Sequence, residues 1–183
     1  MIKNDKWIRE MSIKYDMIKP FEKDQIKNLK ISYGTSSYGY DMRLSNKFML
    51  IKSGVKILDP KHLSDRLFIY RTVNNYIKIP PNSTILGKSV EYFKIPRNIL
   101  TIAFGKSTYI RCGILINITP FEPEWEGYVT LSIANMTSIY VKVYINEGIA
   151  QVLFLSVNEV CEKSYVDKKG KYNIQKIITH AKI

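Results

Sequence analysis

The feature that most constrains the fold is a series of short apolar runs separated by turn residues from about Val55 onward. The turn signals are Asp59-Pro60, Pro80-Pro81-Asn82, Pro96-Arg97-Asn98, Pro120 with Pro123, and Asn146-Glu147-Gly148. The runs between them are Tyr76 to Ile79, Thr84 to Phe93, Ile99 to Phe104, Gly113 to Ile118, Tyr128 to Ala134, Ile139 to Ile145 and Ile149 to Ser156. Short strands at this spacing favour an all-β barrel or jelly-roll sandwich over βαβ units.

The N-terminal segment differs from the rest of the chain. Trp7, Ile8, Met11 and Tyr15 recur at helical spacing, and Asn4 or the next residue can serve as the N-cap. We therefore expect a short amphipathic helix, within a helical segment 1–30, whose apolar stripe packs on the core.

Between residues 31 and 44, glycines and hydroxyl residues interrupt alternating aromatic and aliphatic positions, which is typical of a turn that leads into a strand. Asp41 and Arg43 are two apart and would point the same way on a strand. They are expected either to pair at the rim or to meet a ligand together.

The length of 183 residues, with 45% hydrophobic and 24% charged residues, predicts one domain over 1–183. There is no apolar run of 18 residues and no apolar N-terminal leader, so the expected location is the cytoplasm, without a membrane partner. The polar, basic tail 164–183 is expected to stay mobile until something orders it. In that tail, Tyr165, Lys171 and Gln175 would suit a clamp on a nucleotide.

The net charge of +12 comes from lysines spread along the chain. We rank a generic surface charge first, a small polyanionic ligand second and nucleic acid third, and expect no nucleic-acid partner. The cysteines and histidines lack metal-ligand spacing, which argues against a zinc site and against a disulfide framework. They are Cys112, Cys161, His62 and His180.

One stretch carries the donors of an anion site. Gly105 and Gly113 enclose a lysine, two hydroxyl residues and an arginine, all suited to phosphate oxygens, between two apolar runs. The spacing of a Walker loop and the Gly-x-Gly-x-x-Gly pattern are both absent. The donors are therefore expected to lie in a connection between two strands.

Several motifs in order closely resemble the dCTP deaminases of the dUTPase-like superfamily. They are Ser36-Ser37-Tyr38-Gly39-Tyr40-Asp41-x-Arg43, Val90-Glu91-Tyr92-Phe93-x-Ile95-Pro96, Gly105-Lys106-Ser107-Thr108-Tyr109-Ile110-Arg111-x-Gly113 and Glu122-Pro123-Glu124-Trp125-Glu126-Gly127. The resemblance implies a distorted β-barrel and a homotrimer with active sites at subunit interfaces. It also implies Mg²⁺ carried by the triphosphate, and dTTP as an inhibitor. The implied reaction is zinc-independent deamination of dCTP to dUTP and ammonia, a step toward dUMP and dTTP; the motifs of zinc deaminases are absent.

The resemblance also implies roles for individual residues. The phosphate and catalytic loop corresponds to Lys106, Ser107, Thr108, Tyr109, Ile110 and Arg111, in which Ser107 and Arg111 would position the water and the cytosine. The pyrimidine would be held at Thr130 and Leu131, and further nucleotide contacts fall at Gln151, Tyr165, Lys171 and Gln175. No residue is expected to bind a metal directly.

Two regions depart from the family pattern, the strand after the Trp125 turn and the tail. The general base of the family is a glutamate where this chain has Ser132, followed by Ile133 where an aromatic residue is usual. A serine of ordinary pKa cannot take a proton from water, and a positioned base contributes about 10²–10⁴-fold to a rate, so weakened deamination is expected. The tail reads Ile174-Gln175-Lys176-Ile177-Ile178-Thr179-His180 instead of a glycine-rich segment ending in Thr-Leu-Pro.

Four functions remain open, of which nucleic-acid binding, suggested by the charge alone, ranks last. The first is a dCTP deaminase, weakened, in which Glu122 or Glu124 takes over from the absent base. The second is a catalytically silent trimer that still binds dCTP or dTTP. The third is a dUTP pyrophosphatase or bifunctional deaminase, because that sister family shares the barrel and a motif like Gly39-Tyr40-Asp41.

Overall fold

The structure is a computed structural model that describes residues 1–182. It contains two helices, α1 (Asp5–Tyr15) and α2 (Ser107–Ile110), and a 3₁₀ turn at Asp65–Leu67. The strands are β1 (Ile18–Lys19), β2 (Gly34–Ser36), β3 (Gly39–Ile51), β4 (Phe68–Thr72), β5 (Tyr76–Ile79), β6 (Ser83–Lys94), β7 (Ile99–Gly105), β8 (Ile114–Asn117), β9 (Glu126–Asn135), β10 (Val141–Tyr144) and β11 (Gly148–Ser156). The predicted mainly-β fold with a short N-terminal helix is confirmed.

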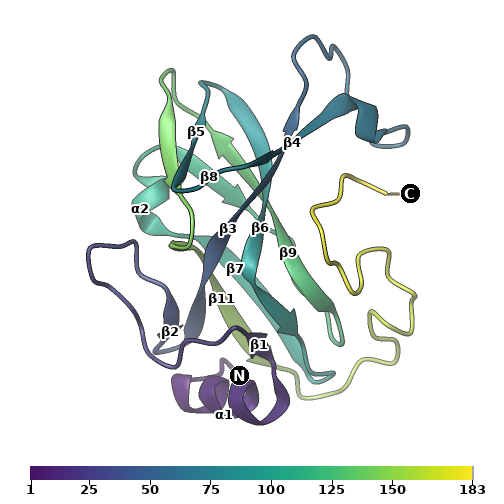
Figure 1. Ribbon diagram of the computed structural model, residues 1–183. Helices are drawn as coiled ribbons and strands as arrows, with labels where there is room; N and C mark the ends of the chain where they lie inside the picture. Colours follow the sequence, from purple (N-terminus) through teal and green to yellow (C-terminus); the bar gives the residue numbers. More distant parts are fainter. Residues whose placement is uncertain (183) are drawn as a thin grey trace.

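The strands form a nearly closed barrel (Figure 1). The main sheet runs β7-β11-β3-β6-β9-β8, with β1 on β6 and both β2 and β4 on β3, while β10 and β5 form a separate antiparallel pair. The two ends of this order meet, because a methyl group on Gly105 of β7 would lie 3.0 Å from Ile116 Cβ in β8. Side chains on the inner face of the barrel are therefore packed on all sides.

Side chains on β9 alternate strictly between the barrel core and the outer face. Val129, Leu131 and Ile133 are at most 3% exposed and belong to the core, whereas Thr130 and Ser132 are half-buried on the outer face. A strand turns successive side chains to opposite faces, so this arrangement follows from the sequence pattern. The outer face of β9 is thus the one that can meet a ligand.

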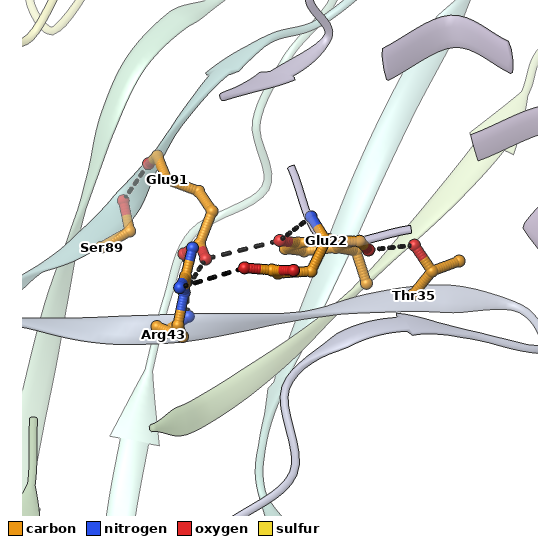
Figure 2. A network of polar contacts seen from close by, with 6 residues as sticks. Glu22, Thr35, Arg43, Ser89 and Glu91 are labelled. Carbon is orange, nitrogen blue, oxygen red and sulfur yellow. Dashed lines mark hydrogen bonds and ion pairs between the residues drawn. The ribbon is translucent and has the colours of Figure 1, made fainter. Parts of the chain in front are cut away.

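Polar side chains bridge irregularities in the β6 pairing (Figure 2). The Ser89 hydroxyl donates to Glu91 O at 2.6 Å and accepts from Val129 N–H at 2.9 Å. Glu91, fully buried, accepts from the Arg43 backbone N–H at 2.8 Å and pairs with its guanidinium at 2.6 Å. Burial raises the pKa of Glu91, and Arg43 opposes that shift. These bonds replace ladder bonds that the bulges interrupt.

The N-terminal helix forms as predicted but is shorter than the segment 1–30. The Asn4 side chain caps it by accepting from Trp7 N–H at 3.1 Å, and Ile8 is fully buried. Beyond Tyr15 the chain adopts β1 and irregular structure up to β2. No helix within residues 1–182 is long and apolar enough to cross a membrane.

Candidate active site

The donor loop, Lys106–Arg111, connects β7 to β8 as the sequence predicted. Residues 107–110 form the single turn of α2, and Gly113, at φ +72°, leads the chain into β8. The side chains of Ser107, Thr108, Ile110 and Arg111 are exposed. Two hydroxyl groups and one guanidinium are therefore available to a ligand on this side of the barrel.

Lys106 is held from within the protein. Its Nζ donates to Asp41 Oδ2 at 2.7 Å and to Ser32 Oγ at 2.9 Å, and Gln25 Nε2 donates to the same Asp41 oxygen at 2.9 Å. The Lys106 side chain is 15% exposed and that of Asp41 is 1% exposed. The ammonium thus fastens the start of the donor loop to β3. Asp41 and Arg43 do not pair with each other, since Arg43 bonds Glu91.

Two residues that were predicted to bind the nucleotide, Tyr109 and Leu131, have their side chains in the core. Tyr109 is 3% exposed, and its hydroxyl accepts from Tyr144 N–H at 2.8 Å. Burial raises the pKa of that hydroxyl. Leu131 is fully buried in the barrel. Either residue would meet a ligand only through its backbone.

Ser132 lies on the outer face of β9, in register with Leu86 of β6 and Asn117 of β8. Two residues earlier, Thr130 faces Lys88, whose Nζ lies 3.5 Å from the centre of the Tyr128 ring. Burial, with a smaller effect of Lys47, lowers the pKa of Lys88. Sequence reasoning missed Lys88. The alternation along β6 could have indicated which face its side chain takes, but only the register between β6 and β9 shows that it lies beside Thr130.

The tail, residues 164–182, lies next to β9 and contacts both its backbone and the Thr130 side chain. Gln175 forms a parallel bridge with Gly127, its side chain donates to Thr130 Oγ1, and its carbonyl accepts from Tyr128 N–H at 2.8 Å. Within the tail, the Tyr165 hydroxyl accepts from Tyr172 N–H at 3.0 Å. Lys171 is exposed. Of the three predicted tail residues, Gln175 is therefore the one whose side chain reaches the outer face of β9.

The predicted site residues fall into two groups: the donor loop precedes β8, whereas Ser132 on the outer β9 face is in register with Asn117 at the other end of β8. In Figure 1, α2 lies to the left of the barrel and the tail to the right, next to β9. Gln151 belongs with the donor loop, because it lies in register with Asp41 and Phe104. A single chain therefore does not bring the donor loop and the Thr130 to Ser132 segment together.

An open depression of about 660 Å³ adjoins the donor loop. Its lining comes from the 27–32 segment, the donor loop and the β10 end, and consists of Lys27, Leu29, Lys30, Ile31, Ser32, Thr108, Tyr144 and Glu147. The charged residues in this lining are two lysines and one glutamate. Among residues 1–182, no three His, Cys, Asp or Glu side chains gather as they would around a metal ion.

Neither glutamate suggested as a substitute base lies near Ser132. Glu122 pairs with Lys168 at 2.6 Å, and Glu124 pairs with Arg97 at 2.7 Å. Both precede β9, and the six residues from its first residue to Ser132 span roughly 20 Å of strand. Within one chain, Ser132 therefore has neither of these carboxylates beside it.

The chain is similar to known dCTP deaminases along its whole length. A family model described as dCTP deaminase-like matches residues 2–157. A dCTP deaminase of Nitrosomonas eutropha is 54% identical over 187 residues, which cover 100% of this chain and 99% of the relative. A dCTP deaminase of Acidobacterium capsulatum is 54% identical over 183 residues, with 100% and 99% covered. The crystal structure of 2'-deoxycytidine 5'-triphosphate deaminase from Agrobacterium tumefaciens shares the fold, with a TM-score of 0.63 and 16% identity over 85% of this chain and 48% of that one.

Proposed function

This chain belongs to the dCTP deaminase-like family, and from that membership we propose that it binds dCTP and hydrolyses it slowly to dUTP and ammonia. Identity of 54% over the full length of curated dCTP deaminases supports the activity and its place in nucleotide metabolism. The proposed slow rate rests on one observation: a serine, Ser132, occupies a half-buried position on the outer β9 face, two residues after Thr130.

The proposed reaction adds water to C4 of the cytosine ring and expels the amino group as ammonia. The water must lose a proton as it attacks, and the leaving group must gain one. Ser132 cannot accept that proton at neutral pH, because its hydroxyl is neutral and weakly basic. Binding does not need that proton transfer, so we expect affinity to be kept while the chemical step is slowed.

The donor loop suits the triphosphate. Ser107, Thr108 and Arg111 are exposed donors, and arginine binds phosphate oxygens in a bidentate way. Because these groups donate hydrogen bonds and have no carboxylate among them, they fit phosphate oxygens and not Mg²⁺. The metal would be held by the triphosphate, where it neutralises phosphate charge. Lys106, which is fastened to Asp41, would act mainly by holding the loop.

The complete site is proposed to form between copies of the chain, in a homotrimer. Within one chain the donor loop, before β8, and Ser132, beside the last residue of β8, form two separate groups, and a neighbouring copy would unite them. An apolar strip crosses the β7–β8 junction, where Ile102, Phe104 and Leu115 are 37%, 57% and 53% exposed. Clustered exposed apolar side chains mark protein contact surfaces, which supports assembly.

Single-turnover release of ammonia from Mg-dCTP tests the proposal. The wild type, Ser132→Glu and Ser132→Ala are compared at saturating enzyme. Ser132→Glu is expected to react about 10²–10⁴-fold faster than the wild type, because it restores a proton acceptor. Ser132→Ala is expected to match the wild type, since the serine performs no proton transfer.

Two results would contradict this account. A fast wild type that loses its activity in Ser132→Ala would make the serine a working catalytic group. Inactivity of all three proteins, with dCTP still bound, would favour the catalytically silent homologue, which Ser132 also supports. In a separate assay with dUTP as substrate, release of pyrophosphate would establish the pyrophosphatase or bifunctional alternative.

A further inference from the structure

The end of the tail is buried in a second apolar cluster outside the barrel core. Ile178 is 4% exposed and packs with Met49 and Phe68, which are 1% and 8% exposed. We call this cluster the seat; its remaining members, partly buried, are Leu63, Leu67 and Leu86. The adjacent Ile177 is 65% exposed. Ile177 and Ile178 are thus adjacent isoleucines, of which only Ile178 is buried in the seat.

A second contact fixes the same stretch of tail. The His180 ring stacks on Phe68, with ring centres 5.6 Å apart and planes 10° from parallel. His180 Nε2 lies 3.5 Å from Asp65 Oδ1, which also accepts from the Tyr70 hydroxyl at 2.8 Å. The tail is therefore held by both the 3₁₀ turn and β4, two elements of the segment 52–72 that projects from the barrel.

The seat adjoins the outer face of β9. Its member Leu86 lies in register with Ser132, and Lys88, two residues further along β6, lies in register with Thr130. Lys88 Nζ also approaches Lys176 O at 3.5 Å, midway along the tail between the seat and Gln175. Gln175 and Ile178 are three residues apart, so anchoring Ile178 restricts where the Gln175 side chain can reach.

We propose that Ile178 is a positioning residue: by docking in the seat it holds the tail so that Gln175 stays on Thr130, and the segment 52–72 serves as the receptor for the tail. Gln175 would then present its amide to a pyrimidine nucleotide bound at that face. This last step depends on the proposed function, whereas docking of the tail does not.

The effect on affinity follows from the population of the docked tail. An isoleucine buried to this extent loses most of its apolar contact when it is cut to alanine. If only the docked tail binds nucleotide well, the apparent Kd rises in inverse proportion to the docked fraction. We expect Ile178→Ala to weaken binding of Mg-dCTP about tenfold or more. Ile177→Ala removes an exposed side chain and is expected to bind like the wild type.

Limited digestion with trypsin and calorimetric titration with Mg-dCTP test the two steps separately, on the full-length protein. Trypsin can cut the tail at Lys171 and Lys176, which are both exposed. Without nucleotide, Ile178→Ala is expected to be cut there at least about tenfold faster than the wild type and Ile177→Ala. Phe68→Ala, which empties the seat from the other side, should behave like Ile178→Ala.

Equal digestion of Ile177→Ala and Ile178→Ala would overturn the docking. Faster digestion of Ile178→Ala with unchanged dCTP affinity would overturn the positioning role. If the wild type binds no dCTP, the proposed function is wrong, and so is the role of Ile178 in positioning Gln175 for a nucleotide. The digestion of the two variants would still support or refute docking of the tail in the seat. Unfolding midpoints equal to that of the wild type show that the barrel is intact.

Discussion

At the scale of single residues, the ion pair between Lys106 and Asp41 is the contact that fixes the donor loop to the barrel. Asp41 Oδ2 receives both the Lys106 ammonium and the Gln25 amide. Its other oxygen is buried with no hydrogen-bond partner in the described chain. The carboxylate therefore depends heavily on Lys106, because a buried charge is tolerated only when it is paired.

Lys106→Met is expected to lower the free energy of unfolding by about 3–5 kcal/mol, because it leaves the Asp41 carboxylate buried with Gln25 as its remaining partner. Chemical denaturation measures this change. Lys168→Met is the control, since Lys168 forms an equally short but exposed pair with Glu122 at 2.6 Å and should change stability little. Adding Asp41→Asn to Lys106→Met should recover part of the loss. Similar effects of the two lysine substitutions would contradict the assigned role of Lys106.

Sequence reasoning named candidate site residues but could not give their surroundings. Alternation on β9 was enough to separate Leu131 from Thr130 and Ser132. It could not show that the Lys106 ammonium meets Ser32 and Asp41, since these contacts span 74 and 65 residues of chain. Contacts between distant segments depend on the packing of the whole barrel, which local patterns do not contain.

At the scale of elements, Gly113 sets the geometry between α2 and β8. It has φ +72°, and a methyl group at this position would overlap the Thr137 side chain. Gly54 has φ +86° but has no neighbour within 4 Å of an added methyl group. The two glycines therefore separate the effect of backbone conformation from that of crowding.

Gly54→Ala is expected to destabilise the protein by about 1 kcal/mol, through its backbone conformation alone. Gly113→Ala should cost about 2 kcal/mol or more, because the overlap with Thr137 adds to the same conformational term. Chemical denaturation of both variants gives the two values. Equal losses would show that Thr137 moves aside freely, and that the turn after α2 is not constrained by packing.

Strands bounded by strong turn signals were the elements most readily predicted. The run Tyr76 to Ile79 matches β5, and the six runs after it agree with strands β6 to β11 within a few residues at each end. The tail was expected to be mobile, yet its residues 174–180 contact β9 and the seat. Its order comes from surfaces built by β4, β6 and β9, so no pattern within the tail reveals it.

At the scale of the whole molecule, the barrel holds two separate groups of candidate ligand-binding residues. The donor loop connects β7 to β8, and the Thr130 to Ser132 segment lies on the outer face of β9, which the tail adjoins (Figure 1). Each group alone is a set of surface donors. Together, across an interface between copies, they would enclose a triphosphate and its base.

The central claim is that this chain holds a pyrimidine deoxynucleoside triphosphate whether or not it reacts quickly. Calorimetric titration of the wild type with Mg-dCTP, in buffer of fixed salt concentration, tests it most directly. The account predicts saturable binding of one nucleotide per chain, weakened in Arg111→Ala, which removes the exposed guanidinium of the donor loop. Absence of saturable heat with dCTP, dUTP and dTTP alike would contradict it.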